Sequence, residues 1–377
     1  MKVLHLFSNA KWTGPAEPAL NLCVQLRQIG VEANFACSPD AGEAINKVVE
    51  TARDRGIEPI LTFRLDKHRN PFSNAVDRLR LARHLLEHPY DLIHCHLDND
   101  HRIAAHPAAK RGIPVIRSSY YGSGFPVKRA YTRLLSHTAH LIEPSNQAAE
   151  CDMEAHGIDS ARLTVVPGAV DTERFDPARQ VPDGRRWLNI PPDAFVVGIV
   201  ARMQTHRHYE DFFAAVQRLV KARHNTHVIV VGRGSKQEQV ALEPVRRLGL
   251  EDRVHFPGYL DGENYVGMLK AFDVKVFLVP GTDGTCRAVR ECMAMRKPVV
   301  AADRGMLREI VEHNRNGIIC DGSAEALFQA LDRLAEDRRL VYEMGVAARE
   351  TAITRYSLEA HTFAVIQVYE RVLAANA

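Results

Sequence analysis

Residues 280–303 read PGTDGTCRAVRECMAMRKPVVAAD. The pattern predicts the end of a strand, a glycine-bearing loop, a helix that starts near Thr285, and a second strand. Glycines before a helix leave backbone N–H groups and a positive dipole end free, which suit phosphate or sugar hydroxyls. Asp283 falls in the predicted loop and Glu291 about two turns into the helix, so two carboxylates can grip two parts of one ligand. Taken alone, a helix-capping Asp283 and a surface Glu291 explain the pattern as well.

A second informative stretch, GIVARMQTHRHYEDF, spans residues 198–212. Arg202 leaves a predicted strand, Phe195–Val200, and Arg207 follows in the next loop. Two guanidinium groups at the carboxyl end of a parallel strand can clamp a diphosphate and neutralise charge on a leaving group. Judged alone, two solvated loop arginines are an equal alternative.

Short apolar runs alternate with helical patterns along the whole chain, which is typical of βαβ units in parallel sheets. The apolar runs restart after a charged, proline-rich segment, and we therefore predict an α/β fold of two facing Rossmann-like, doubly wound domains with a deep cleft between them. The expected boundaries are 1–170, a linker at 171–192, 193–355, and a terminal helix at 356–377 that crosses back to the first domain. Predicted strands of the first domain include Pro59–Thr62, Leu92–Cys95 and Leu141–Ile142.

Composition excludes several classes of protein. A net charge of +3 over 377 residues is too small to argue for nucleic acid. The seven cysteines form no CxxC pair, which predicts reduced thiols rather than disulfides or zinc. The N-terminal apolar run is too short for a signal peptide, and no run is long enough to span a bilayer. We therefore expect a cytoplasmic protein.

One segment departs from this balance. Between His101 and Ile142 there are seven basic residues and no acidic one: Arg102, Lys110, Arg111, Arg117, Lys128, Arg129 and Arg133. A solvated helix face explains such a strip. The alternative is peripheral contact with an anionic membrane or a phosphorylated acceptor through Arg102, Lys110, Arg111, Lys128, Arg129 and Arg133.

Taken together, these segments resemble glycosyltransferase family 4, the retaining GT-B enzymes, over nearly the whole chain. The stretch 280–300 is similar to the family's Glu-x7-Glu motif, with Asp283 in the first place. VARMQTHRHYEDF is similar to the donor-phosphate motif, with Arg207 in the place of a lysine. VVPGAVDTERF at 165–175 resembles the domain-linker motif, and VVGRGS with RVHFPGY the middle of the donor domain. WTGPAEPALNL resembles the family's glycine-bearing loop between the first strand and the first helix, which implies that Gly14 lies near the donor phosphates or the acceptor.

The resemblance implies roles for these positions. Glu291 would hold the nucleotide ribose, Asp283 the hydroxyls of the transferred sugar, and Arg202 with Arg207 the diphosphate. Gly284, Thr285 and Cys286, at the start of the helix, join the donor-binding set. Asp283 is one methylene shorter than glutamate, and Arg207 differs from lysine in hydrogen-bond geometry. Tyr120 stands where the family often has a histidine; a packed aromatic is the plain alternative.

Two other motifs need weighing. Asp98-Asn99-Asp100 follows a strand that carries His94 and His96, and this pattern is compatible with a metal site. We nevertheless expect neither a metal nor a cofactor. The residues that we assign to the acceptor side are His96, Asp100, His101 and Tyr120. Gly232-Arg233-Gly234 lacks the third glycine of a dinucleotide fingerprint.

The expected function is metal-independent, retaining transfer of a sugar from a nucleotide-diphosphate sugar to a glycan or glycolipid, such as a cell-envelope polysaccharide or lipopolysaccharide intermediate. Alternatives are a non-hydrolysing sugar-nucleotide 2-epimerase and an inactive sugar-nucleotide-binding protein.

Overall fold

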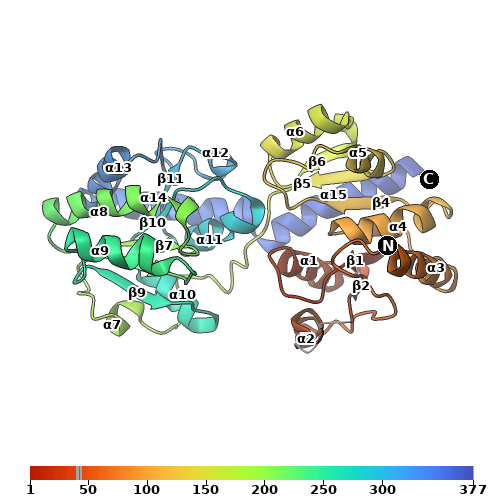
Figure 1. The fold of residues 1–377 in the computed structure, drawn as a ribbon, viewed down its shortest axis with the longest axis horizontal. Helices are drawn as coiled ribbons and strands as arrows, with labels where there is room; N and C mark the ends of the chain where they lie inside the picture. The colour runs from red at the N-terminus through yellow and green to blue at the C-terminus, as the bar shows by residue number, and fades with distance from the viewer. Residues whose placement is uncertain (40–41, 43–44, 377) are drawn as a thin grey trace. The chain divides into compact units, whose positions relative to one another are not determined.

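The computed structural model describes residues 1–39, 42 and 45–376, without the side chains of Asp283 and Thr285. The chain divides into two compact units. The first contains Met1–Ala169, Thr282–Gly284 and Leu358–Ala377, and the second Val170–Gly281 and Thr285–Ser357. Each unit is built on a six-stranded parallel sheet with helices on both faces (Figure 1). The α/β class expected from the alternating pattern is confirmed.

The sheet of the first unit has the order β2-β1-β3-β4-β5-β6. Its strands are β1 (Lys2–Phe7), β2 (Glu32–Cys37), β3 (Leu92–Cys95), β4 (Val115–Ser118), β5 (His140–Glu143) and β6 (Leu163–Val165). The helices are α1 (Ala16–Gln28), α2 (Lys47–Asp54), α3 (Pro71–Glu87), α4 (Asp98–Ala109), α5 (Arg129–Ser136), α6 (Asn146–His156) and α15 (Leu358–Asn376), with a short 3-10 turn η1 (Ser160–Arg162).

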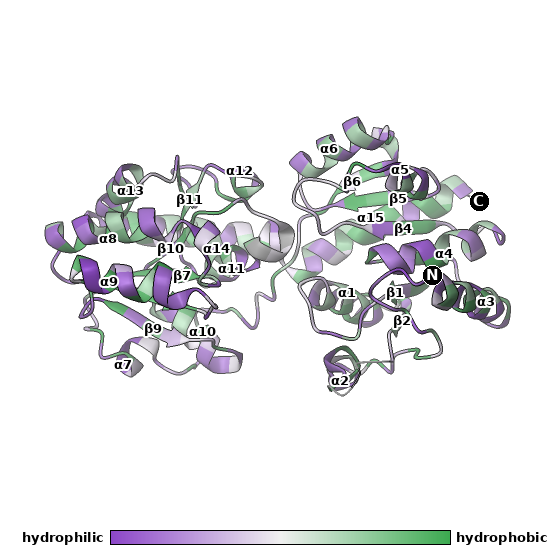
Figure 2. Cartoon of the chain, in the orientation of Figure 1, coloured by the Kyte–Doolittle hydropathy of each residue, from purple (hydrophilic) through white to green (hydrophobic). Residues whose placement is uncertain are grey.

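Alternation along β1 divides the core of the first unit between the two faces of the sheet. Val3 and Phe7 pack with α1 and with Val365 and Val368 of α15. Leu4 and Leu6 belong to a second cluster on the other face. The last helix of the chain is therefore part of the core of the first unit, because its apolar stripe covers one face of that sheet. Figure 2 shows the apolar strands between more polar helices.

The sheet of the second unit has the order β12-β11-β10-β7-β8-β9. Its strands are β7 (Phe195–Val200), β8 (Thr226–Val231), β9 (Val254–Gly258), β10 (Val274–Phe277), β11 (Val299–Ala302) and β12 (Gly317–Cys320). The helices are α7 (Gly184–Trp187), α8 (Tyr209–Ala222), α9 (Glu243–Leu248), α10 (Gly262–Ala271), α11 (Asp283–Ala294), α12 (Leu307–Ile310), α13 (Ala324–Glu336) and α14 (Arg338–Tyr356), with the turns η2 (Thr205–Arg207) and η3 (Glu238–Leu242).

The close approach of a loop to this sheet requires a glycine. A Cβ atom built at Gly198 of β7 would lie 2.1 Å from the ring of Phe272. Phe272 is fully buried in the core of the unit. Glycine is thus the residue that lets the ring pack directly against the backbone of β7.

Some elements differ from the sequence prediction. Residues 59–62 form no strand; Ile60 makes a single bridge to Ala36. Residues 171–192, which we expected as a linker, include α7 and contribute Phe175 and Ile190 to the core of the second unit. The sequence did not reveal this packing, because the few apolar residues of the segment are separated by many charged ones. Among the described residues, no helix is long and apolar enough to cross a membrane.

Candidate active site

The loop after β10 leads directly into α11. The helix begins at Asp283 rather than near Thr285, so the predicted loop is shorter than expected. Gly281 bridges Gly305, whose φ of 56° is left-handed, and a Cβ at Gly281 would meet the sulfur of Cys286. The Cys286 thiol is fully buried in the core, so its expected part in donor binding would fall to its backbone. The side chains of Asp283 and Thr285 lie outside the described residues.

Glu291 is held in position by its neighbours. Its carboxylate accepts a hydrogen bond from the Tyr265 hydroxyl of α10, with a distance of 2.5 Å to Oε2. Nε of Arg287, one turn earlier on α11, lies 3.5 Å from Oε1. Burial and the nearby carboxylate raise the pKa of Tyr265 well above its usual range, so the hydroxyl keeps its proton and donates. Glu291 is only 6% exposed, so it is not the surface glutamate that was the alternative.

Arg202 and Arg207 both follow β7, at the carboxyl edge of the second sheet. Arg202 is exposed, and Arg207 is partly buried in η2. Burial lowers the pKa of Arg207, and the nearby Arg202 lowers it further, whereas Tyr209 raises it. The buried Nε of Arg207 has no hydrogen-bond partner within the described parts of the chain. The two side chains thus concentrate positive charge beside a strand end, as a diphosphate site requires.

Sequence reasoning missed Lys275. This residue lies in β10, fully buried, and its Nζ makes no hydrogen bond to any residue that the structure describes. Burial lowers the pKa of Lys275 to about 8; Cys292 and Glu291 raise it, and Arg207 lowers it. Lys275 therefore lies within the electrostatic reach of both Glu291 and Arg207. The signal was a single charge in the apolar run VKVFLV at 274–279.

The two candidate glycines lie in open surroundings. Gly14 precedes α1, and Gly284 lies in the first turn of α11. Both are exposed, and a Cβ at either would meet no atom within 4 Å. Neither glycine is therefore required by packing, which leaves room for a ligand to approach the backbone.

Three of the four acceptor-side candidates are buried, which corrects their assignment as lining residues. Asp100 accepts hydrogen bonds from the backbone N–H of Ser8, at 2.9 Å, and of Leu97, at 3.0 Å, and so joins the loop after β1 to the start of α4. His101 pairs through Nε2 with Thr138 Oγ1, and His96 is covered as well. These buried side chains form hydrogen bonds with other polar groups of the protein instead of facing a ligand.

Tyr120 is the fourth candidate and the one that is partly exposed. Its hydroxyl lies 2.8 Å from Nδ1 of the buried His96. The ring is also stacked on that imidazole, with ring centroids 6.3 Å apart. The contact with His96 thus holds the Tyr120 ring in position, whereas an aromatic residue that only fills space would not need a polar partner.

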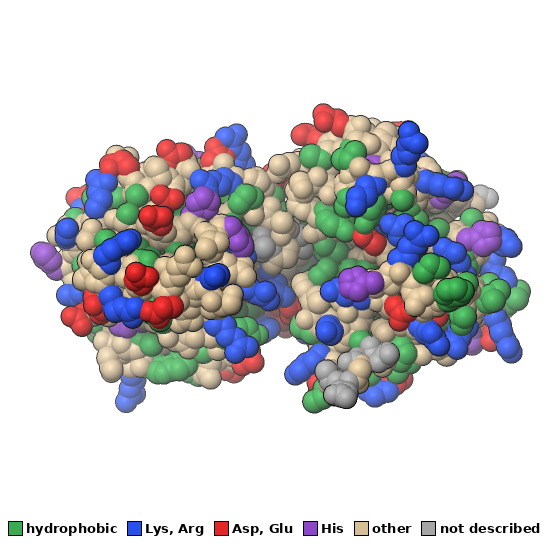
Figure 3. Space-filling model, in the orientation of Figure 1, with side chains coloured by type: hydrophobic (Ala, Val, Ile, Leu, Met, Phe, Trp, Pro, Cys, Tyr) green, Lys and Arg blue, Asp and Glu red, His purple; other side chains and the backbone are tan. Residues whose placement is uncertain are grey.

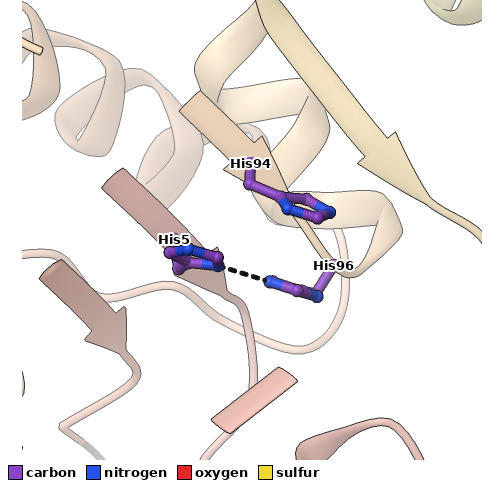
Figure 4. A group of neighbouring side chains, drawn as sticks. All are labelled: His5, His94 and His96. Carbon is purple, nitrogen blue, oxygen red and sulfur yellow. Dashed lines mark hydrogen bonds between the residues drawn. The ribbon is translucent and has the colours of Figure 1, made fainter. Parts of the chain in front are cut away.

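His5, His94 and His96 form a buried cluster, the histidine stack (Figure 4). One ring nitrogen of each lies within 4.8 Å of the others. The rings of His94 and His96 are nearly parallel, with centroids 4.4 Å apart and planes at 16°. Imidazole lone pairs lie in the ring plane, so parallel rings do not direct them at one metal ion. His5 Nδ1 and His96 Nε2, 3.0 Å apart, share a hydrogen bond instead.

The carboxylates of the Asp98-Asn99-Asp100 motif are likewise engaged within the protein. Asp98 accepts from Arg117 Nη2 at 2.9 Å, from the Tyr121 hydroxyl at 2.9 Å and from the Tyr131 hydroxyl at 2.5 Å. Arg117 is itself buried and therefore does not belong to the exposed basic strip. The motif orders the ends of β3 and β4.

The other members of the basic strip lie at the surface of the first unit. Lys110, Lys128, Arg129 and Arg133 are exposed. Arg102 and Arg111 are partly buried; Arg102 lies over the Tyr131 ring, and Arg111 donates to the carbonyl of Ala82. The strip thus covers α4, α5 and the turns next to them.

Two family models of glycosyltransferases together match most of the chain. Residues 14–174 match the model described as Glycosyltransferase Family 4, and residues 182–351 match Glycosyl transferases group 1. The chain is 28% identical over 271 residues to a GDP-mannose-dependent alpha-mannosyltransferase of Mycolicibacterium smegmatis, covering 66% of this chain and 65% of that protein. It is 31% identical over 202 residues to the lipopolysaccharide core biosynthesis glycosyltransferase LpsD of Rhizobium meliloti, covering 53% and 57%.

A solved structure agrees over the full chain. A glycosyltransferase from Rickettsia africae superimposes with a TM-score of 0.83 at 18% identity, covering 99% of this chain and 98% of that one. The fold is thus the two-domain GT-B fold. The chain belongs to the group 1 glycosyltransferases of family 4. Its matches span about 57–65% of the length of the two relatives named above.

Proposed function

We propose that this protein is a retaining glycosyltransferase that moves a sugar from a nucleotide-diphosphate sugar to a glycan or glycolipid acceptor. The observation that carries the proposal is the grouping at the carboxyl edge of the second sheet. Arg202 and Arg207 follow β7, α11 starts just after β10, and β7 and β10 are neighbours. Ligands of doubly wound sheets bind at this edge.

In the proposed reaction the bond between the anomeric carbon and the phosphate oxygen breaks, and an acceptor hydroxyl oxygen bonds to that carbon. The acceptor proton passes to the departing phosphate. Arg202 and Arg207 neutralise the charge that develops on the diphosphate, and the start of α11, with Gly284, supplies backbone N–H donors. Glu291 holds the ribose hydroxyls, and Asp283 the hydroxyls of the transferred sugar. No metal is needed, because two guanidinium groups supply the positive charge.

On the acceptor side we assign Tyr120, with Gly14 near the donor phosphates or the acceptor. A cell-envelope polysaccharide or lipopolysaccharide intermediate is the proposed acceptor, consistent with the name of the relative LpsD. We further propose that the protein is cytoplasmic and contacts the inner face of the membrane through Arg102, Lys110, Arg111, Lys128, Arg129 and Arg133. Exposed lysines and arginines are attracted to anionic lipid.

The test is release of free nucleoside diphosphate with and without an acceptor. A thermal-shift screen against a panel of nucleotide sugars first identifies the donor, because specific binding raises the apparent stability. Release only with acceptor supports transfer. Inversion at C2 of the sugar nucleotide without net release supports the epimerase, and binding with neither release nor inversion supports the inactive binder. Arg339→Ala, which removes a side chain that is 86% exposed on α14, is the matched control for arginine variants of the site.

A further inference from the structure

Helix α3 leaves an apolar stripe uncovered. Its buried face, Ser73, Asn74, Asp77, Leu81 and Leu85, packs toward α4. On the outer side, Phe72 is 87% exposed, Val76 40%, Leu79 74% and Leu86 69%. These positions recur at four, seven and fourteen residues, which places them on one line along the helix. Arg83, whose side chain is 81% exposed, lies on the same side of the helix between Leu79 and Leu86. An exposed apolar stripe of this kind indicates a contact surface, whereas scattered apolar residues do not.

Most of the charges around this stripe are positive, and the acidic Asp66, just before the helix, is partly buried. Arg64, Lys67 and Arg69 are exposed just before the helix, and Arg78 and Arg80 are exposed along it. The acidic groups of α3 are already engaged within the protein. Asp77 is buried and accepts from the backbone N–H of Arg64 and Leu65, at 2.9 and 2.8 Å. Glu87 forms an ion pair with Arg83, with 2.8 Å between Oε1 and Nε.

The stripe also continues into the basic strip. Arg78 on α3 donates a hydrogen bond of 3.1 Å to the backbone carbonyl of Arg102 on α4. Arg102 in turn lies 5.1 Å from the ring centroid of Tyr131 on α5. Just before α5, Val127 is 78% exposed next to Lys128. In the space-filling view, hydrophobic and basic side chains gather over α3 and α4 (Figure 3).

We propose that α3 is an interfacial membrane anchor that inserts Phe72, Val76, Leu79 and Leu86 into the surface of an anionic bilayer. The apolar side chains match the hydrocarbon of such a bilayer, and the basic side chains beside them match its negatively charged head groups. A second copy of the chain is a poorer occupant, because pairing two such stripes would oppose the arginines of both copies. The proposal deepens the membrane contact proposed above, and it does not depend on the transfer reaction.

Vesicle co-sedimentation of the full chain tests the proposal without any donor or acceptor. The probes are phosphatidylcholine vesicles with and without phosphatidylglycerol. The double variant Phe72→Ser/Leu79→Ser should bind anionic vesicles on the order of 10- to 100-fold more weakly, because two apolar side chains no longer leave water. The control is Tyr342→Ser/Ile353→Ser, which removes two exposed side chains of α14, and should bind as the unchanged protein does.

A second variant reports insertion directly. Phe72→Trp should shift its fluorescence to the blue with anionic vesicles, and part of the binding should persist in high salt, which removes attraction by charge alone. Equal binding of the double variant and the unchanged protein overturns the proposal, as does a tryptophan that stays in water. A dimer in sedimentation that Phe72→Ser/Leu79→Ser abolishes assigns the stripe to a second copy instead. Calorimetry with nucleoside diphosphate tests the proposed function separately, so either can fail alone.

Discussion

Glu291 allows the sharpest test of the proposed site, by the change Glu291→Gln. Glutamine has the same shape, and its remaining oxygen can still accept the 2.5 Å hydrogen bond from Tyr265. The amide nitrogen then replaces the oxygen that faces Arg287, 3.5 Å away. The site therefore keeps its geometry and loses its negative charge. Losing a charge-assisted hydrogen bond to a ribose hydroxyl costs about 1.5–3 kcal/mol, or roughly 10- to 150-fold in affinity.

Titration calorimetry with the nucleoside diphosphate and with the sugar nucleotide measures this effect. Glu291→Gln should weaken both ligands alike, because both carry the ribose. Asp283→Asn should leave the nucleoside diphosphate nearly unaffected, weaken the sugar nucleotide, and lower turnover by more, since the sugar must be held in its reactive pose. The control is Glu343→Gln, an exposed helix glutamate paired with Arg339.

Two results would refute this reasoning. Unchanged binding of both ligands to a folded Glu291→Gln variant would remove Glu291 from the ribose site. Equal losses for both ligands in both variants would mean that the carboxylates act by ordering the loop and α11. Urea unfolding of each variant separates that outcome, because a disordered helix start lowers the free energy of unfolding as well as the affinity.

The remaining predictions concern catalysis, packing and titration. Arg207→Ala should cut turnover by roughly 10²–10³, and the unchanged enzyme should keep its activity in EDTA; loss in EDTA with rescue by manganese would contradict the metal-free site. Gly198→Ala should lower the free energy of unfolding by about 1–3 kcal/mol, because its Cβ would overlap the Phe272 ring; an unchanged urea midpoint would contradict this. Burial lowers the pKa of His5 to about 3 and lowers the pKa values of the rest of the histidine stack. These histidines therefore bind protons in the unfolded chain that they do not bind in the folded one, and His5 should lower the free energy of unfolding by about 2 kcal/mol at pH 5. Burial raises the pKa of Asp100 to about 7, which acts in the opposite direction, so urea unfolding compares the protein with His5→Phe, and pH profiles of the same shape would refute the prediction. Lys275→Met should raise the free energy of unfolding by about 1–3 kcal/mol at pH 7, since it removes a buried charge, and a destabilised variant would show that the ammonium is paired.

The fold was accessible from the sequence because its elements carry strong local patterns. Residues 195–200 are uniformly apolar and form β7 with those bounds, and 317–320 form β12 in the same way. Helix starts were harder. α4 begins at Asp98, within the Asp98-Asn99-Asp100 motif, because the Asp100 carboxylate accepts the backbone N–H of Leu97 and caps the first turn. Cap geometry of this kind depends on side-chain rotamers that no periodicity reveals.

The acceptor-side residues show a different limit. Alternation placed His94 of β3 and His96, just after the strand, on one side of the sheet, but it could not say what covers that side. The cover comes from α15, where the Tyr369 hydroxyl lies 2.5 Å from His94 Nδ1, 275 residues away along the chain. A polar residue at a strand end can face a ligand or a distant helix, and only the long-range contact decides between them.

Lys275 shows why part of the candidate site escaped a search by motif. The recognisable motifs of the sequence lie in loops and at helix starts, where glycine, aspartate and arginine recur at characteristic spacings. Lys275 lies in the middle of a buried strand, where a charge is costly unless something compensates it. It is also the buried strand residue whose pKa responds both to Glu291 and to Arg207, the proposed ribose and diphosphate ligands. A positive charge behind those two groups favours an anionic ligand in front of them. The cost that Lys275 imposes on folding is therefore consistent with a role in the electrostatics of the donor site.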